Sequence, residues 1–281
     1  MAFGRRPDGS RTQGLPPLRR IMPLLLPRRN DAYVLFEQQI PTAPLLPLLA
    51  RLNAERAPET RLTLFHCVLR ALGLVFTEFP RLNRFVLGGH TYDRRGIYLS
   101  LSAKQRLDRE APVFSTKLAF DASESLLQMT DHLLGVLRQG RAGDAPADRE
   151  IRSLLPLPGP FLRAVMWAQR RLDARGLLPA RLLDDDPLYA SAFVANLGSV
   201  GLDAAFHHLF EYGTIPIFVT MGRTHLAPVV RDDGSVGSRE IFVLRYTYDE
   251  RIADGFYAAR ALERLAEILA DPETLSGASS A

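Results

Sequence analysis

The chain has 281 residues, of which 47% are hydrophobic and 23% are charged, and its formal net charge at pH 7 is +4. These values are ordinary for a soluble globular protein with one large domain or two small ones. No apolar run approaches 18 residues, so we expect no transmembrane helix. The single cysteine, Cys67, excludes an internal disulfide and a thiolate metal cluster.

Residues 1–31 carry the excess positive charge. They hold seven arginines and two acids, a net charge of +5, so the rest of the chain has a net charge of −1. We interpret residues 1–20 as a flexible basic arm and a solvated tail, with contact to nucleic acid or an anionic membrane as the alternative. The apolar stretch 21–27 is too short and proline-rich for a signal peptide, so we expect a cytoplasmic protein.

The first half of the chain alternates between strand and helix patterns. Hydrophobic periodicity predicts strands at 31–40 and 96–103 and helices at 42–55, 60–80 and 121–143. The helix at 60–80 is apolar on nearly all faces, which is typical of a helix at the centre of a core. Cys67 falls inside this helix, so we interpret it as a buried structural thiol.

The second half of the chain continues the mixed pattern. Residues 144–187 are less regular and contain a predicted amphipathic helix at 160–176. The remaining predictions are strands at 189–198, 215–222 and 239–249, a hairpin turn at 231–235, a helix at 255–271 and a disordered tail at 272–281.

Three motifs occur in a recognisable order. They are HCVLRALGLVFTEFPRLNRFV (66–86), FVANLGSVG (193–201) and YDERIADGFYAARALERL (248–265). Together they resemble the catalytic core of the dihydrolipoamide acyltransferases of 2-oxoacid dehydrogenase complexes. More broadly, they resemble the CoA-dependent acyltransferase superfamily, which includes chloramphenicol acetyltransferase. The likeness spans roughly residues 15–271.

This resemblance implies a fold and an assembly. It implies a single α/β domain over 21–271, a chloramphenicol acetyltransferase-like two-layer sandwich whose mixed sheet has flanking helices. Residues 144–187 are then an insertion. The resemblance further implies a homotrimer with its active site in a channel at the subunit interface. Coenzyme A or acyl-CoA enters that channel as cosubstrate, and no metal is expected.

Two positions that carry chemistry in the family differ here. The family's general-base histidine corresponds to Glu250, and its oxyanion-stabilising hydroxyl corresponds to Ala195. From ordinary pKa values, transfer of a thiol proton to glutamate is about 2 units, or roughly 3 kcal/mol, more uphill than transfer to histidine. Loss of one oxyanion donor typically costs about 100- to 1000-fold in rate. The resemblance therefore implies a rebuilt or degenerate acyltransferase site.

The other motif positions match the family. Asn196 and Asp254 are carried over as candidate catalytic residues, and Ser199 and Arg251 as candidate cofactor-binding residues.

Asp254 also has a structural role in the family. The matching aspartate pairs there with an arginine from an early segment and fixes the motif loop. Arg28 or Arg29 could supply that arginine, and the sequence does not choose between them.

A pair of histidines, His207 and His208, is the second candidate. Their stretch, HHLFEYG, superficially resembles a motif of peptide-synthetase condensation domains. We interpret that likeness as accidental because the stretch follows the Asn-Leu-Gly strand. Either ring could supply the missing base if its loop reaches the channel; ordinary hydrogen-bonded histidines are the alternative. No third ligand stands at helical or hairpin spacing, which disfavours a zinc site.

Two functions remain open from the sequence. The first is acyl transfer between CoA and an unknown acceptor, with Glu250, His207 or His208 as the base. The second is a non-catalytic trimeric scaffold, or a pseudoenzyme that still binds CoA or a partner.

Overall fold

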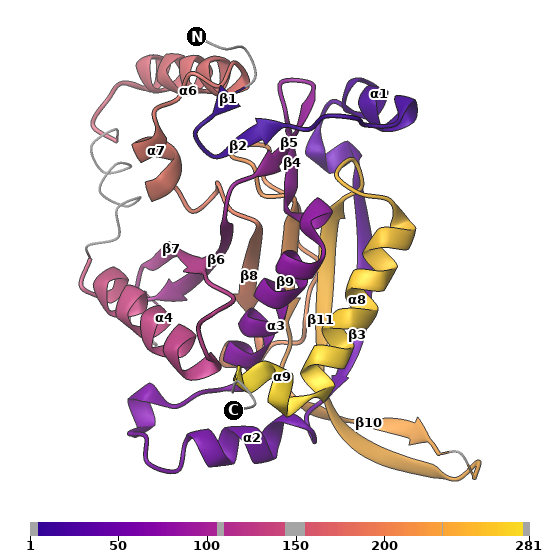
Figure 1. Ribbon diagram of the computed structural model, residues 1–281. Helices are drawn as coiled ribbons and strands as arrows, with labels where there is room; N and C mark the ends of the chain where they lie inside the picture. The colour runs from indigo at the N-terminus through magenta and orange to yellow at the C-terminus, as the bar shows by residue number, and fades with distance from the viewer. Residues whose placement is uncertain (1–4, 106–109, 144–154, 232, 278–281) are drawn as a thin grey trace.

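The computed structural model describes residues 5–105, 110–143, 155–231 and 233–277 (Figure 1). They form a seven-stranded mixed sheet with helices on one face and a separate four-stranded sheet at one end. The predicted two-layer α/β sandwich is therefore confirmed.

The large sheet has the strand order β10-β11-β9-β8-β6-β7, and β3 also pairs with β11. Its β6–β8 and β8–β9 pairs are parallel, and its other pairs are antiparallel. The strand bounds are Tyr33–Pro41 (β3), Ile97–Lys104 (β6), Val113–Phe120 (β7), Ala192–Asn196 (β8), Ile217–Met221 (β9), His225–Val230 (β10) and Val236–Asp249 (β11). Periodicity predicted β3, β6, β8, β9 and β11, and the hairpin turn between β10 and β11.

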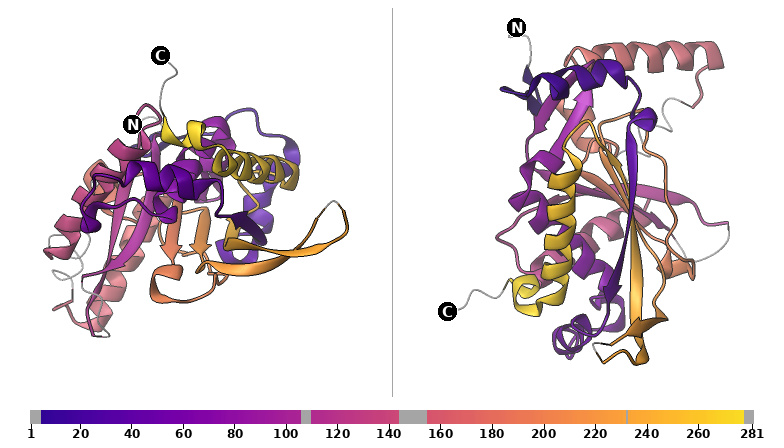
Figure 2. Two further views of the ribbon diagram at one scale, coloured as in Figure 1. Left: turned by 90° about the horizontal axis from the view of Figure 1, so that it is seen from below. Right: turned by 90° about the vertical axis from the view of Figure 1, so that its right-hand side faces the viewer.

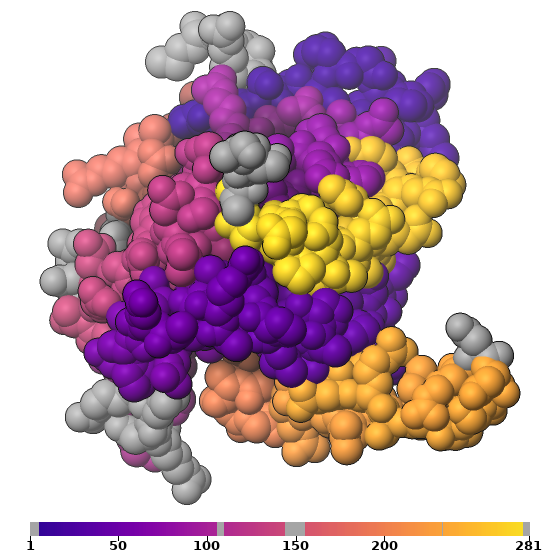
Figure 3. Space-filling view, turned by 60° about the horizontal axis from the view of Figure 1, so that its bottom comes forward, coloured from indigo at the N-terminus to yellow at the C-terminus, as the bar shows by residue number. Residues whose placement is uncertain are grey.

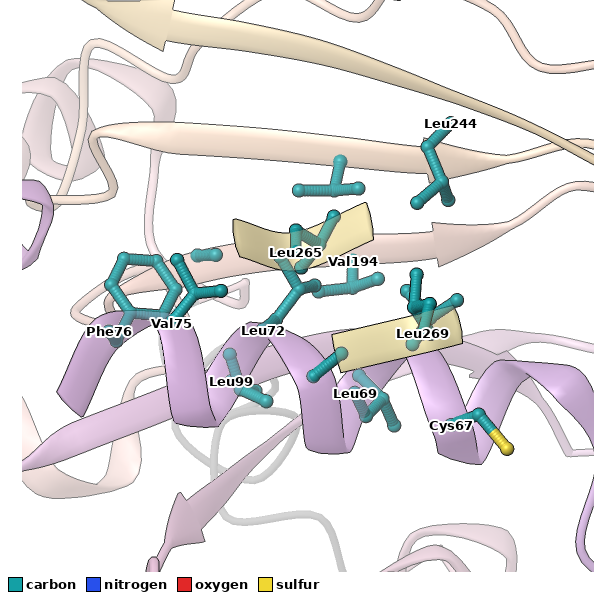
Figure 4. Close-up of a cluster of buried hydrophobic side chains, with 14 of the residues drawn as sticks. Cys67, Leu69, Leu72, Val75, Phe76, Leu99, Val194, Leu244, Leu265 and Leu269 are labelled. Atoms are coloured by element: carbon teal, nitrogen blue, oxygen red, sulfur yellow. The ribbon is translucent and has the colours of Figure 1, made fainter. Parts of the chain in front are cut away.

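Helices α3 (Leu64–Glu78), α4 (Leu126–Arg141) and α8 (Gly255–Ala270) cover one face of this sheet (Figure 2). Figure 4 shows side chains of α3, including Leu69 and Leu72, packed against β8 and β11. Burial raises the pKa of the Cys67 thiol to about 12, which agrees with a structural thiol. Helix α3 is thus the central core helix that its apolar surface predicted.

The same apolar surface requires one correction. The segment Pro58–Glu78 has the length and composition of a membrane-spanning helix, although we expected no such stretch. Burial inside the fold covers 61% of its apolar window. Packing against the sheet and the neighbouring helices therefore accounts for this composition.

The chain end beyond α8 is also more ordered than expected. Residues Pro272–Ser276 form a short helix, α9, which packs against α8, α3 and α2 (Leu45–Leu52). Leu275 is fully buried. The prediction of a disordered tail is wrong for 272–277, because this apolar side chain ties the segment to the core; residues 278–281 lie outside the described part of the chain.

The basic arm is folded rather than flexible over the part that the structure describes. Strands β1 (Arg5–Arg6) and β2 (Gly9–Arg11) form the small sheet with β5 (His90–Arg94) and β4 (Arg84–Leu87), and α1 (Pro17–Leu25) follows. Arg6 is 3% exposed and forms ion pairs with Asp8 and Asp173, both at 2.8 Å. The charge of Arg6 is thus compensated inside the fold, whereas Arg11 and Arg20 are exposed, so the arm is folded and only partly solvated.

The predicted insertion contains α6 (Gly159–Ala174) and α7 (Ala180–Asp185), whereas residues 144–154 lie outside the described ranges. Asp173 anchors α6 through Arg6 and through the hydroxyl of Tyr189, which donates to it at 2.6 Å. Short 3-10 turns occupy Arg29–Asp31, Pro58–Thr60, Pro80–Asn83 and Gly198–Val200.

The β10–β11 hairpin projects away from the body of the molecule (Figures 1 and 3). The side chains of Leu226, Val230 and Val236 on this hairpin are 70%, 71% and 72% exposed. A projecting hairpin with three exposed apolar side chains is a poor surface for an isolated subunit and a good one for contact with another chain.

Two glycines of α4 provide a test of the packing against β7. A Cβ at Gly140 would lie 2.0 Å from the Phe114 ring, whereas a Cβ at Gly135 would meet nothing within 4 Å. We expect Gly140→Ala to destabilise the protein by about 1–3 kcal/mol through overpacking. Gly135→Ala should stabilise it by up to about 1 kcal/mol through helix propensity. Urea denaturation of both variants measures this difference, and equal effects would contradict the packing.

His66, at the N-terminus of α3, makes the free energy of unfolding depend on pH. His66 completes a capping box, accepting a hydrogen bond from the Thr63 N–H at 3.0 Å, and burial lowers its pKa from 6.5 to about 4. Between these values the unfolded chain binds more protons, so stability falls as pH falls. Wild type should lose about 3 kcal/mol between pH 7 and pH 4 through this group. His66→Gln keeps an acceptor for the cap, and its stability-pH curve should be flatter by this amount.

Candidate functional site

The loop at 249–254, between β11 and α8, is built around a buried ion pair. Asp249 is fully buried and Arg251 is 3% exposed. The Arg251 guanidinium donates to both carboxylate oxygens of Asp249, from Nε at 2.8 Å and from Nη2 at 2.7 Å. A bidentate pair of this kind fixes both side chains, so Arg251 is committed to the loop rather than free to face a ligand.

A second arginine approaches the same carboxylate. The Nε of Arg29 lies 3.9 Å from Asp249 Oδ2, and its Nη groups donate to the carbonyls of Phe210 and Gly213. Burial lowers the pKa of Arg29, and Asp249 opposes that shift. Asp249 therefore compensates two buried cations.

Asp254 does not take the partner that the sequence suggested. Arg29 binds Asp249, and Arg28 pairs with Asp31 at 3.0 Å on the surface. Asp254 instead caps α8, accepting a hydrogen bond from the Tyr257 N–H at 2.9 Å, and this bond lowers its pKa. The prediction that Arg28 or Arg29 pairs with Asp254 is wrong, because the fully buried carboxylate is the one that requires a cation.

An arginine that the sequence analysis missed holds Glu250 in place. Arg19 of α1 donates from Nη1 to the carbonyls of Glu250 and Ala253. The Glu250 N–H donates to the Ala32 carbonyl at 2.9 Å. The Glu250 side chain is half-buried, and its carboxylate has no hydrogen bond or ion pair with any residue in the described ranges. The Glu250 backbone is therefore fixed, while its carboxylate is available for contact with another group.

The loop that carries the two histidines is clamped to the same region. Glu211 accepts hydrogen bonds from the backbone N–H groups of Arg29 at 3.2 Å and Asn30 at 2.9 Å. Although burial alone would raise the pKa of Glu211, these bonds and the Arg29 charge lower it. The Asn30 amide also bonds both backbone groups of Leu209. Residues 209–213 are thus fixed to the segment that holds Asp249.

His207 lies on the face of the sheet away from the helices. Its ring stacks on Phe218 with centroids 4.0 Å apart and planes 11° apart, and it also contacts Phe210 and His208. Its Nδ1 lies 2.8 Å from the His208 carbonyl oxygen. Because a carbonyl only accepts, this contact places a proton on Nδ1, so in the neutral ring Nε2 carries the lone pair. His208, which is exposed, makes the same kind of contact to Leu209 at 3.1 Å.

The Asn-Leu-Gly strand end lies beside this aromatic cluster. Ala195 packs against the cluster of Phe193, Leu209 and Phe218. Asn196 and Ser199 bond each other across the turn at Gly198–Val200: the Ser199 N–H donates to Asn196 Oδ1 at 3.1 Å, and its hydroxyl donates to the Asn196 carbonyl at 2.7 Å. Both polar side chains therefore serve the turn.

Within one chain, Ala195 and Glu250, the two positions that differ from the family, lie far apart. Ala195 is in register with Thr220 of β9, and Thr220 is in register with Arg245 of β11. Glu250 follows Arg245 by five residues, which is about 16 Å along a strand. Phe218, on which His207 stacks, pairs with Thr247 and lies between them. Ala195 and Glu250 therefore cannot act on one atom unless two chains meet.

No group of three or more His, Cys, Asp or Glu side chains with metal-binding geometry occurs in the described ranges. The candidate residues form a hydrogen-bonded loop, an aromatic-histidine cluster and a polar turn.

Comparison with known proteins agrees with this architecture. Residues 181–276, which include β8, the 249–254 loop and α8, match the family described as 2-oxoacid dehydrogenases acyltransferase (catalytic domain).

Solved structures share the fold over nearly the whole chain. A probable dihydrolipoamide acetyltransferase from Listeria monocytogenes is 15% identical, with a TM-score of 0.60, and the match covers 97% of this chain and 98% of that one. The dihydrolipoamide acetyltransferase of Azotobacter vinelandii is 17% identical, with 94% of each chain covered and a TM-score of 0.61. A truncated catalytic core of the 2-oxoacid dehydrogenase complex of Thermoplasma acidophilum is 12% identical, with 93% and 98% covered and a TM-score of 0.58.

These matches confirm the resemblance that the three motifs indicated. The chain has the fold of the dihydrolipoamide acyltransferase cores, an α/β sandwich of the chloramphenicol acetyltransferase type.

Proposed function

We propose that this protein transfers an acyl group between coenzyme A and an acceptor, at a rebuilt site between subunits of a homotrimer. His207 is the general base in this proposal, and Glu250 of the partner subunit supports it. The observation that carries the proposal is the contact between His207 Nδ1 and the His208 carbonyl, which in the neutral ring gives Nε2 the lone pair.

The chemistry needs one base that takes and returns a proton. Nε2 of His207 removes the proton from the acceptor's nucleophilic group, which attacks the thioester carbonyl of the acyl-CoA. The tetrahedral intermediate collapses, the carbon–sulfur bond breaks, and the imidazolium returns the proton to the leaving thiolate. A carboxylate beside the ring, Glu250 in this proposal, stabilises the imidazolium.

The position of Glu250 in its motif supports this role. The Azotobacter vinelandii structure comes from work on the roles of a serine, a histidine and an asparagine in that enzyme's catalytic mechanism. The histidine and the asparagine are four positions apart there, as Glu250 and Asp254 are here. The present chain has a matching loop, but glutamate stands at position 250 where the family has the histidine.

Three features support assembly into a trimer. The separation of about 16 Å between Ala195 and Glu250 leaves each chain with two half-sites. The projecting β10–β11 hairpin exposes the apolar side chains of Leu226, Val230 and Val236. Tyr33 and Leu35 on β3 are 45% and 43% exposed on the same sheet face as the aromatic cluster. A cytoplasmic location fits this proposal.

A direct assay tests the function. Purified protein is incubated with acetyl-CoA and longer acyl-CoA thioesters, together with thiol, amine and alcohol acceptors, and free CoA release is followed. We expect acceptor-dependent release that Glu250→Gln lowers at least about tenfold, since it removes one charge-assisted contact. No release with any acceptor would contradict the proposal.

A non-catalytic role is the second candidate, and the loss of both family positions favours it. If the protein is a scaffold, wild type shows no turnover, and Glu250→His combined with Ala195→Ser creates measurable transfer. The same double variant also shows whether the two half-sites meet, because the new histidine and serine can cooperate only across an interface.

A further inference from the structure

A polar cavity of about 370 Å³ lies outside the site described above, between the β2–α1 connection and the β4–β5 hairpin. Figures 1 and 2 show α1 beside β5 at this end of the molecule. The cavity walls come from residues 11–15, Arg20 and residues 89–91. A second hollow of about 510 Å³ shares Arg11, Arg20 and His90 with it and continues along α1.

The charge of this cavity is positive and uncompensated. Arg11 and Arg20 line both hollows, and no carboxylate lines either of them. The Arg11 guanidinium lies 3.0 Å from Nδ1 of His90. Because a guanidinium only donates, Nδ1 accepts here, and the His90 proton is on Nε2. Burial and the Arg11 charge lower the pKa of His90, as expected where cations face each other without an anion.

Two threonines of the same wall hold the β2–α1 connection against β5. Thr12 is 8% exposed and Thr91 is 4% exposed. Their backbones bond each other, Thr12 N–H to Thr91 O at 3.0 Å. The Oγ1 atom of each is buried and does not face the hollow, so the two side chains shape the wall and the charged groups remain for a ligand.

The second hollow has a different character. Its wall along α1 is apolar and consists of Leu15, Pro17, Ile21 and Leu24. Gly88 and Gly89 form the opposite side at the β4–β5 turn, with φ values of 56° and 78° that glycine adopts readily. A ligand that fills both hollows therefore has an anionic end and an apolar end.

We propose that this cavity binds a phosphomonoester whose phosphate lies between Arg11, Arg20 and His90 and whose apolar substituent lies along α1. A phosphate offers enough oxygens for two guanidinium groups and an imidazole N–H. A soluble phosphate ester and the head group of an anionic phospholipid share this chemistry. The site is separate from the 249–254 loop, so the proposal does not rest on acyl transfer.

Phenyl phosphate is the probe that matches both ends of the cavity. Its binding to wild type is measured by isothermal titration calorimetry and compared with binding to Arg11→Gln/Arg20→Gln. The matched control is Arg163→Gln/Arg170→Gln, which removes the same charge from exposed positions of α6. We expect the cavity variant to bind at least about 100-fold more weakly, since each charge-assisted contact is worth about tenfold or more, and the control to bind as wild type does. Equal binding by the two variants, or no binding by wild type, overturns the proposal.

A second variant separates recognition from folding. His90→Phe keeps a ring at an exposed position and removes the imidazole N–H, so its folding should be unimpaired while its affinity for phenyl phosphate falls about threefold to tenfold. Unchanged affinity would overturn the assignment of His90 to the phosphate site.

The source of the phosphate is decided by two further arms. Displacement of phenyl phosphate by a soluble alkyl phosphate, without sedimentation on phosphatidic acid vesicles, assigns a soluble ligand. Sedimentation on those vesicles that Arg11→Gln/Arg20→Gln abolishes and the α6 control retains assigns a lipid head group. If both double variants lose sedimentation to the same extent, the binding is general charge attraction, and this result would overturn a head-group site.

Discussion

Asp249→Asn is expected to destabilise the protein by about 3–5 kcal/mol, the largest effect on stability of any single substitution considered. Asp249 is fully buried and its carboxylate faces Arg251 at 2.7 Å and Arg29 at 3.9 Å. Asparagine keeps the shape of the side chain but leaves two buried guanidinium groups without an anion, and removing one partner of a buried charge cluster has this cost. Chemical denaturation at pH 7 measures it.

The chain offers a matched control for this prediction. Asp31→Asn makes the same substitution in an ion pair with Arg28 that is largely exposed, where side-chain exposures are 37% and 74%. Exposed pairs contribute about 0–1 kcal/mol, so this variant should remain close to wild type. A loss below about 1 kcal/mol for Asp249→Asn would mean that water reaches the cluster and that the loop is not a fixed frame.

The largest effect on activity is expected from His207→Phe, which should lower the rate of acyl transfer about 100- to 10,000-fold. Phenylalanine preserves the ring stack on Phe218 and removes the Nε2 base. His208→Phe is the control, since His208 belongs to the same loop and makes the same kind of backbone contact. Similar losses in the two variants would indicate a folding effect of the loop and would refute the assignment of His207 as the base.

Mixing two inactive variants tests the interface. If each site combines His207 of one chain with Glu250 of the next, a trimer refolded from equal amounts of His207→Phe and Glu250→Ala should regain about a quarter of the sites. No recovery would place both groups in one chain or remove one of them from the reaction. This experiment depends on assembly alone and not on the identity of the acceptor.

Much of the fold could be predicted from local patterns. The apolar periodicity of α3 and α8 and the alternation in β3 and β6 predicted their type and approximate bounds, because burial of one face or of all faces leaves a period in the sequence. Strands β1, β2, β4, β5, β7 and β10 were missed. Strands β1, β2, β4 and β5 are short, and β1 and β2 lie in an arginine-rich stretch whose charges suggested a solvated arm.

The candidate site was predicted only in part. The matching motif positions located the 249–254 loop and the strand end at Asn196, and the sequence identified Glu250 and Ala195 as the altered positions. The sequence could not assign Arg19 to the carbonyls of Glu250 and Ala253, since its partners are more than 230 residues away. It also left open whether Arg28 or Arg29 pairs with Asp254, whereas the structure places Arg29 beside Asp249.

The sequence by itself determined five of the seven strands of the large sheet, its long helices, the three-motif frame and the absence of the expected base. Those features depend on residue identity and on neighbours within a few positions. The tertiary structure decided which charges meet: Arg29 and Arg251 on Asp249, Asp254 at the start of α8, and His207 on Phe218. It decided them because the energy of a buried charge or ring depends on the groups around it in space, which only the packed fold brings together.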